Sequence, residues 1–124
     1  MRRGRRVRAA ALGALAALML GSCGRAEAPA GPLRLVAAPD GRDTRLSLVP
    51  APGLRINARL APALELRGGG IVRFDTGRVT PDSAYFAEPP GARLPGRHRT
   101  VHGTLRASVC HIHEQVCRGL TLEI

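Results

Sequence analysis

Glycine and proline interrupt the chain so often after residue 22 that no long amphipathic helix can form there. All ten prolines and twelve of the fifteen glycines lie in this part. Between these breaks, apolar and polar residues alternate with period two, which indicates half-buried strands. We predict strands over Leu33–Ala37, Thr44–Val49, Ala63–Arg67, Ile71–Asp75, Thr100–Val109 and Leu120–Ile124. Several short strands in one small domain predict an all-β antiparallel sandwich.

The first 22 residues have the pattern of an export signal. Five arginines and no acid lie within residues 1–8, and an apolar run follows from Ala9 to Leu20. Twelve residues are too few for a membrane span, which needs about 20. A basic start, a short apolar run and small residues are typical of a secretory signal peptide.

The end of this segment, Leu20-Gly21-Ser22-Cys23, resembles the lipobox of bacterial lipoproteins. The resemblance implies that Cys23 is lipidated and becomes the first residue of the mature chain. Ordinary cleavage nearby would instead leave Cys23 as a single thiol. We therefore predict a signal peptide over 1–22, a lipidated cysteine and flexible tether over 23–32, and a folded domain over 33–124.

The positive charge does not indicate a nucleic-acid partner. Of the formal charge of +10, five units belong to the expected signal, which leaves +5 on the mature chain. The chain has only one tyrosine, two phenylalanines and no tryptophan, so it lacks the aromatic platforms on which bases stack. We expect no nucleic-acid binding.

Residues Asp82–His98 form the longest stretch without a clear period. Long loops in small domains are often functional, but Tyr85 and Phe86 would equally serve to anchor a surface loop at the edge of the core. Within and just after this stretch lies a basic cluster, which could hold an anion or be a solvated loop, formed by Arg93, Arg97, His98 and Arg99.

The C-terminal segment pairs well as a hairpin with Cys110 opposite Cys117. That register places Leu105 opposite Leu122 and Ala107 opposite Leu120 on a mostly apolar face. The second face is polar and carries both cysteines on the solvent side, and directly opposed strand residues are close enough for a disulfide. An export signal sends the chain where disulfides form.

Such a disulfide could be a static clip or an exchangeable redox pair, and the register fits both. Positive neighbours stabilise the thiolate that takes part in exchange. His111, His113 and Arg118 are therefore candidate modulating residues. A zinc or copper site on Cys110, His111, His113 and Cys117 has suitable ligand types. However, alternation directs His111 away from Cys110 and the spacing fits no common zinc motif, so we expect neither a metal nor another cofactor.

The pattern Gly-Thr-Leu-Arg-Ala-Ser-Val-Cys followed by Val-Cys resembles the N-terminal domain of DsbD-type thiol:disulfide interchange proteins. The segment Gly53-Leu-Arg-Ile-Asn-Ala-Arg adds to this resemblance, with Arg55 where that family often has histidine. The resemblance implies an immunoglobulin-like sandwich facing the periplasm, with Cys110 and Cys117 as catalytic redox pair.

The resemblance also implies a thioredoxin-like or DsbD-type redox protein as partner. The lipid on Cys23 would hold the chain in the cell envelope, facing the periplasm or the cell exterior, and Gly24 is compatible with sorting to an outer membrane. The alternative function is a non-enzymatic accessory lipoprotein whose hairpin disulfide is structural.

Overall fold

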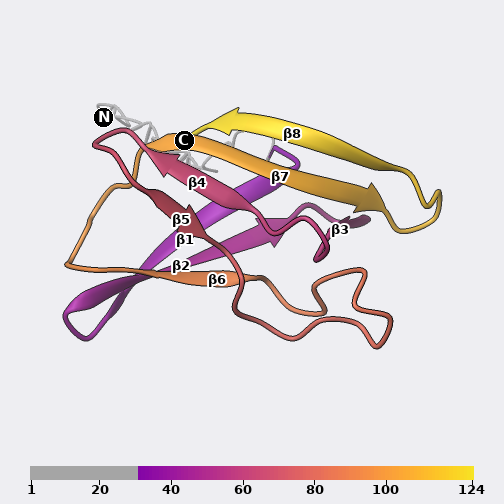
Figure 1. Ribbon diagram of the computed structural model, residues 1–124, viewed down its shortest axis with the longest axis horizontal. Coiled ribbons are helices and arrows are strands. Elements are labelled where there is room, and N and C mark those ends of the chain that lie inside the picture. The colour runs from indigo at the N-terminus through magenta and orange to yellow at the C-terminus, as the bar shows by residue number, and fades with distance from the viewer. Residues whose placement is uncertain (1–30) are drawn as a thin grey trace, which may run out of the picture.

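The computed structural model describes residues 31–124, which form eight strands in two antiparallel sheets (Figure 1). The expected signal peptide, Cys23 and nearly all of the expected tether lie outside the described residues. Within residues 31–124 there is no helix that could cross a membrane. The all-β prediction is confirmed, and the arrangement is that of a β-sandwich consistent with an immunoglobulin-like fold.

The smaller sheet has three strands in the order β1-β2-β6. Its strands are β1 (Leu33–Asp40), β2 (Asp43–Pro50) and β6 (Gly91–Leu94). A tight turn joins β1 to β2, and Gly41 there has a φ of 62°. That backbone conformation costs glycine little, because glycine has no Cβ.

The larger sheet is built around β7 and has five strands: β3 (Leu54–Ile56), β4 (Ala63–Leu66), β5 (Ile71–Arg73), β7 (Gly103–His111) and β8 (Cys117–Glu123). One edge of β7 pairs with β8 over almost its whole length. The other edge pairs with β4 near its start and with β3 near its end, and β5 lies beyond β4. In Figure 1 the β7–β8 hairpin extends past the rest of this sheet at the right.

The core lies between the two sheets. Its fully buried side chains include Leu46, Leu48, Leu64 and Leu105, which lie at predicted alternating positions, and Ile56 of β3, which does not. Phe74 is completely buried although it follows β5, and its backbone N–H donates to the carbonyl of Pro62 at 2.9 Å. The only buried aromatic ring among the described residues therefore belongs to a loop position beside the sheet.

The prediction of an irregular stretch over Asp82–His98 is wrong in part, because β6 lies within it. Its four residues lie between prolines, and β6 forms because β2 offers it a paired edge. Strand β3 was also not predicted; it has only three residues and pairs with β7. Tyr85 and Phe86 are half-buried, and Phe86 packs against the core.

Candidate functional site: the Cys110–Cys117 hairpin

The predicted register of the C-terminal hairpin is confirmed at every pair from Thr104–Glu123 to Cys110–Cys117. The two cysteines form a disulfide, and their Cα atoms are 3.9 Å apart. The His111 N–H donates to the carbonyl of Val116 at 2.9 Å and closes the turn. Gln115 in that turn has a φ of 51°, so the short loop requires one left-handed residue.

The two cysteines differ strongly in burial. Cys110 is 1% exposed, whereas Cys117 is exposed. The register does place both on one face of the sheet, but the expectation that both lie on the solvent side is wrong for Cys110. Cys110 lies on the central strand with β3 on one side and β8 on the other, whereas Cys117 lies on the outermost strand.

Arg55 is the residue of β3 that pairs directly with Cys110. Opposed residues of antiparallel strands project from the same face, so Arg55 shares the face of the disulfide. Its guanidinium lies 5.3 Å from the centre of the Tyr85 ring, in a cation–π contact. The charge of Arg55 therefore lies over Tyr85, and its strand adjoins Cys110 on the side away from β8.

The candidate modulating residues do not gather around the disulfide. His111 and Arg118 alternate with the cysteines along β7 and β8, so both project from the opposite face of the sheet. His113 lies in the turn and is exposed. A role for these three side chains in tuning the cysteines stays a prediction, and the register favours Arg55 for that role instead.

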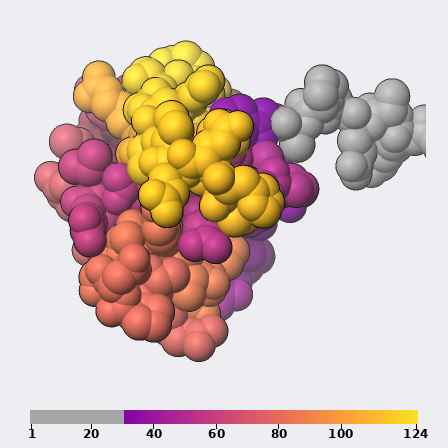
Figure 2. All heavy atoms as spheres, turned by 90° about the vertical axis from the view of Figure 1, so that its right-hand side faces the viewer, coloured from indigo at the N-terminus to yellow at the C-terminus, as the bar shows by residue number. Residues whose placement is uncertain are grey.

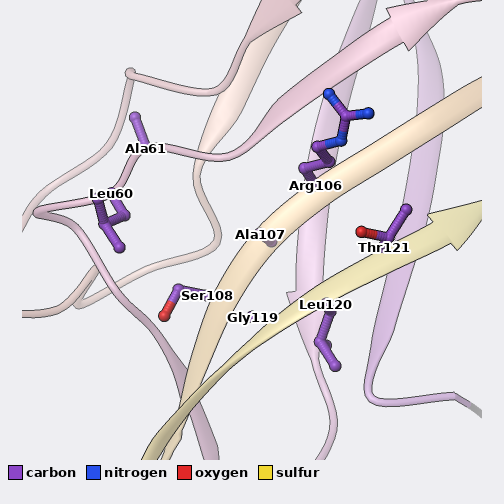
Figure 3. Close-up of a pocket in the computed structure, with 8 residues that line it drawn as sticks. All are labelled: Leu60, Ala61, Arg106, Ala107, Ser108, Gly119, Leu120 and Thr121. Atoms are coloured by element: carbon purple, nitrogen blue, oxygen red, sulfur yellow. The ribbon is translucent and has the colours of Figure 1, made fainter.

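A hollow of about 450 Å³ lies on the disulfide face beside the Ser108–Gly119 pair, two residues along each strand from the cysteines (Figure 3). Leu60 and Ala61, from the loop before β4, form one wall. The other wall belongs to the paired strands and includes Ser108 of β7 and Gly119 of β8. Leu60 is 63% exposed, so the hollow offers an uncovered apolar side chain across from Ser108 and Gly119.

Gly119 keeps this part of the hairpin open. It pairs with Ser108 and is separated from Cys117 by one residue, so it occupies the same face. A Cβ built on Gly119 would have no atom within 4 Å. Seen from the end of the molecule that carries the turn, the yellow C-terminal hairpin stands at the surface (Figure 2).

The clearly shifted pKa values belong to groups outside the hairpin. The Thr80 hydroxyl and the Ala84 N–H bond to Asp82 and lower its pKa, and the Arg78 N–H lowers that of Glu88. In the basic cluster, Asp40 and then Asp43 raise the pKa of Arg93. Among residues 31–124 no three metal-ligating side chains gather closely enough to hold an ion.

Two features of this site were not predicted from the sequence. Arg55 was singled out only through a resemblance, and its pairing with Cys110 depends on the short strand β3. Leu60 carries no sequence signal, because only the path of its loop brings it beside Gly119.

No family model matches the chain, and neither a curated protein nor a solved structure is significantly similar to it. The resemblance to DsbD-type domains therefore stays a prediction from the sequence. The functional argument depends on the geometry of the hairpin itself.

Proposed function

We propose that this chain takes part in thiol–disulfide exchange through Cys110 and Cys117. The observation that carries the proposal is the asymmetry of the bond, in which an exposed Cys117 on an edge strand is joined to a buried Cys110 on a central strand. Because Cys117 is the exposed residue of the pair, we expect a partner thiolate to attack its sulfur and not that of Cys110.

The exchange has two steps. A partner thiolate attacks Sγ of Cys117, a new S–S bond forms, and the Cys110–Cys117 bond breaks with Cys110 leaving as the thiolate. A second thiolate of the partner then attacks the partner's own sulfur in this mixed disulfide and releases Cys117. Two electrons pass from the partner dithiol to the hairpin, and the partner gains a disulfide.

Arg55 assists this step by stabilising the leaving group. Burial alone disfavours a thiolate on Cys110, because a charged group is poorly solvated in apolar surroundings. A guanidinium on the neighbouring strand acts in the other direction. Since a more stable thiolate is a better leaving group, the pairing of Arg55 with Cys110 favours attack on Cys117.

We further propose that the partner is a thioredoxin-like or DsbD-type redox protein, and that a lipid on Cys23 keeps the domain in the cell envelope. The export-type leader and the lipobox-like Leu20-Gly21-Ser22-Cys23 support this location. An oxidising compartment is also where a hairpin disulfide forms and persists.

The second candidate is an accessory lipoprotein in which the disulfide is only structural. The burial of Cys110 favours it, because a sheltered sulfur is a feature of inert bonds. The two candidates differ in whether Cys117 accepts a partner sulfur while the domain stays folded.

The test uses the oxidised full chain and a thioredoxin-like protein that lacks its resolving cysteine. After quenching and alkylation, mass spectrometry should find the partner bound to Cys117, with Cys110 alkylated. Cys110→Ala and Cys117→Ala serve as matched variants. Towards oxidised glutathione, Cys117 in the first variant should react at least ten times faster than Cys110 in the second.

The proposal fails if no mixed disulfide forms under conditions in which oxidised glutathione captures the same partner. A mixed disulfide mainly on Cys110 would overturn the assignment of Cys117 as the attacked residue.

A further inference from the structure

Within residues 31–124, the outer edge of β8 carries backbone hydrogen-bonding groups that pair with no other strand. At one end of the hairpin, the His111 N–H donates to the carbonyl of Val116. At the other end, the Gly103 N–H donates to the carbonyl of Ile124 at 3.3 Å, and the Ile124 N–H donates to the carbonyl of Gly103 at 2.9 Å. Hydrogen-bonded and non-hydrogen-bonded pairs alternate along an antiparallel ladder. The Cys110–Cys117 and Ser108–Gly119 pairs are therefore non-hydrogen-bonded pairs.

In such pairs the backbone N–H and C=O groups point away from the paired strand. On β8 these residues are Cys117, Gly119, Thr121 and Glu123, whose side chains all share the disulfide face. Among the described residues, β8 pairs with β7 alone. A free edge of this kind is a template for an added strand.

The direction of the disulfide makes this edge relevant to exchange. The bond joins a sulfur carried by β7 to a sulfur carried by β8. A thiolate attacks a disulfide roughly in line with the bond that breaks. Because Cys110 lies on the β7 side of Cys117, an attacker on the far side of Cys117 approaches over the outer edge of β8, where an added strand would lie.

We propose that the partner of Cys117 binds as an extended antiparallel strand along the free edge of β8, with its reduced cysteine directly opposite Cys117. This inference rests on the proposed exchange function. In that pairing the two Cα atoms lie about 5.5 Å apart, which is within the range of disulfides. The added strand would exchange backbone hydrogen bonds with Cys117, Gly119 and Thr121.

The same register defines the side chains that the site prefers. The partner residue two positions before the cysteine lies opposite Gly119, over the hollow and beside Leu60. An apolar side chain fits there, because Gly119 leaves the space open and Leu60 offers uncovered apolar surface.

The partner residue four positions before the cysteine lies opposite Thr121, next to Arg106. Arg106 is the one charged residue among those lining the hollow. Its contact with Glu65 is 4.0 Å long and both side chains are well exposed, so this pair is weak. A carboxylate on the partner complements Arg106, and the preferred order is acid, any residue, apolar, any residue, cysteine.

The experiment measures how fast peptides reduce the disulfide of the full chain, with glutathione as reference. The test peptide is acetyl-Thr-Asp-Thr-Leu-Thr-Cys-Thr-amide, and its control is the same peptide with the order of residues reversed. The test peptide should react at least ten times faster than glutathione, and the reversed peptide at about the glutathione rate.

Backbone pairing is tested by single N-methyl groups. Methylation of the leucine nitrogen removes the bond to Gly119 and should cancel the advantage. Methylation of the neighbouring threonine nitrogen, which points away from β8, should leave the advantage nearly unchanged. In the protein, Gly119→Val should remove the preference for leucine, and Arg106→Gln the preference for aspartate.

Equal rates for the test, reversed and leucine-methylated peptides would overturn strand addition. If glutathione reduces the disulfide in that case, the proposed exchange function stands and only the docking mode is wrong. If neither glutathione nor any peptide reduces it, the exchange function itself fails. A stable dimer of the full chain in sedimentation, dissociated by the substitution Gly119→Pro, would show that a second copy occupies this edge and would also overturn the proposal.

Discussion

Reduction of the Cys110–Cys117 bond should lower the stability of the domain without unfolding it. The bond closes a loop of only eight residues, for which the chain-entropy relation gives about 2.5 kcal/mol. For a domain of this size, that corresponds to a decrease in Tm of about 10–20 °C. The loss is small because the closed loop is short, so the link removes little entropy from the unfolded chain.

The assay is urea unfolding followed by far-ultraviolet circular dichroism, with and without a phosphine reductant. Reduction removes no side chain, so the difference in unfolding free energy between the oxidised and reduced forms measures the effect of the covalent link alone. The double variant Cys110→Ala with Cys117→Ala should lose more stability than the reduced domain does, because it also removes the buried Cys110 sulfur and leaves a cavity.

Complete unfolding on reduction would refute this reasoning. An exchangeable pair must remain folded in the dithiol form, since that form carries the electrons to the next acceptor. An unchanged midpoint would equally contradict the estimate, because it would mean that the link restrains nothing in the unfolded chain.

Three further predictions test the sheet, the loop and the site. Gly103→Ala should destabilise the domain by about 3 kcal/mol in urea unfolding, because a Cβ there would overlap a backbone carbonyl of the facing strand β4. The control Gly119→Ala places its Cβ in open space and should change the free energy of unfolding by under about 0.5 kcal/mol. The pKa of Asp82 is lowered in the fold. The ionised Asp82 carboxylate therefore stabilises the fold at pH values above its ordinary pKa of 3.8, and this stabilisation is lost as the pH falls through the pKa of the folded state. Asp82→Asn should flatten that part of a plot of unfolding free energy against pH. Arg55→Gln should slow reduction of the disulfide by glutathione several-fold. Arg118 lies on the opposite face, so Arg118→Gln should leave the rate nearly unchanged. Equal slowing by both variants would show that the net charge of the protein, and not the position of Arg55, affects the rate.

The sequence predicted the hairpin best, because alternation, the two cysteines and the leucines all favour the same register. A slip by one residue would have moved Leu105 and Leu122 to the outer face. The long strands β2 and β7 were predicted for the same reason, as each has several alternating positions.

What the sequence could not indicate depends on contacts between distant segments. Strands β3 and β6 have three and four residues, too few to show a period, and form because β7 and β2 offer them a paired edge. The central position of Cys110 has the same origin, because β3 pairs with β7 beside it. The polar residues on this face of the hairpin predicted that both cysteines are exposed to solvent. The pairing of β3 with β7, which the sequence does not indicate, shows instead that Cys110 lies on a central strand.

The reduction potential of the Cys110–Cys117 pair tests the central claim most directly. The full chain would be equilibrated with dithiol buffers of known potential, and the oxidised fraction read by alkylation and mass spectrometry. Structural disulfides of secreted proteins lie below about −300 mV. An exchangeable pair predicts a more oxidising value with the domain folded in both forms, and a value below about −300 mV would contradict the account.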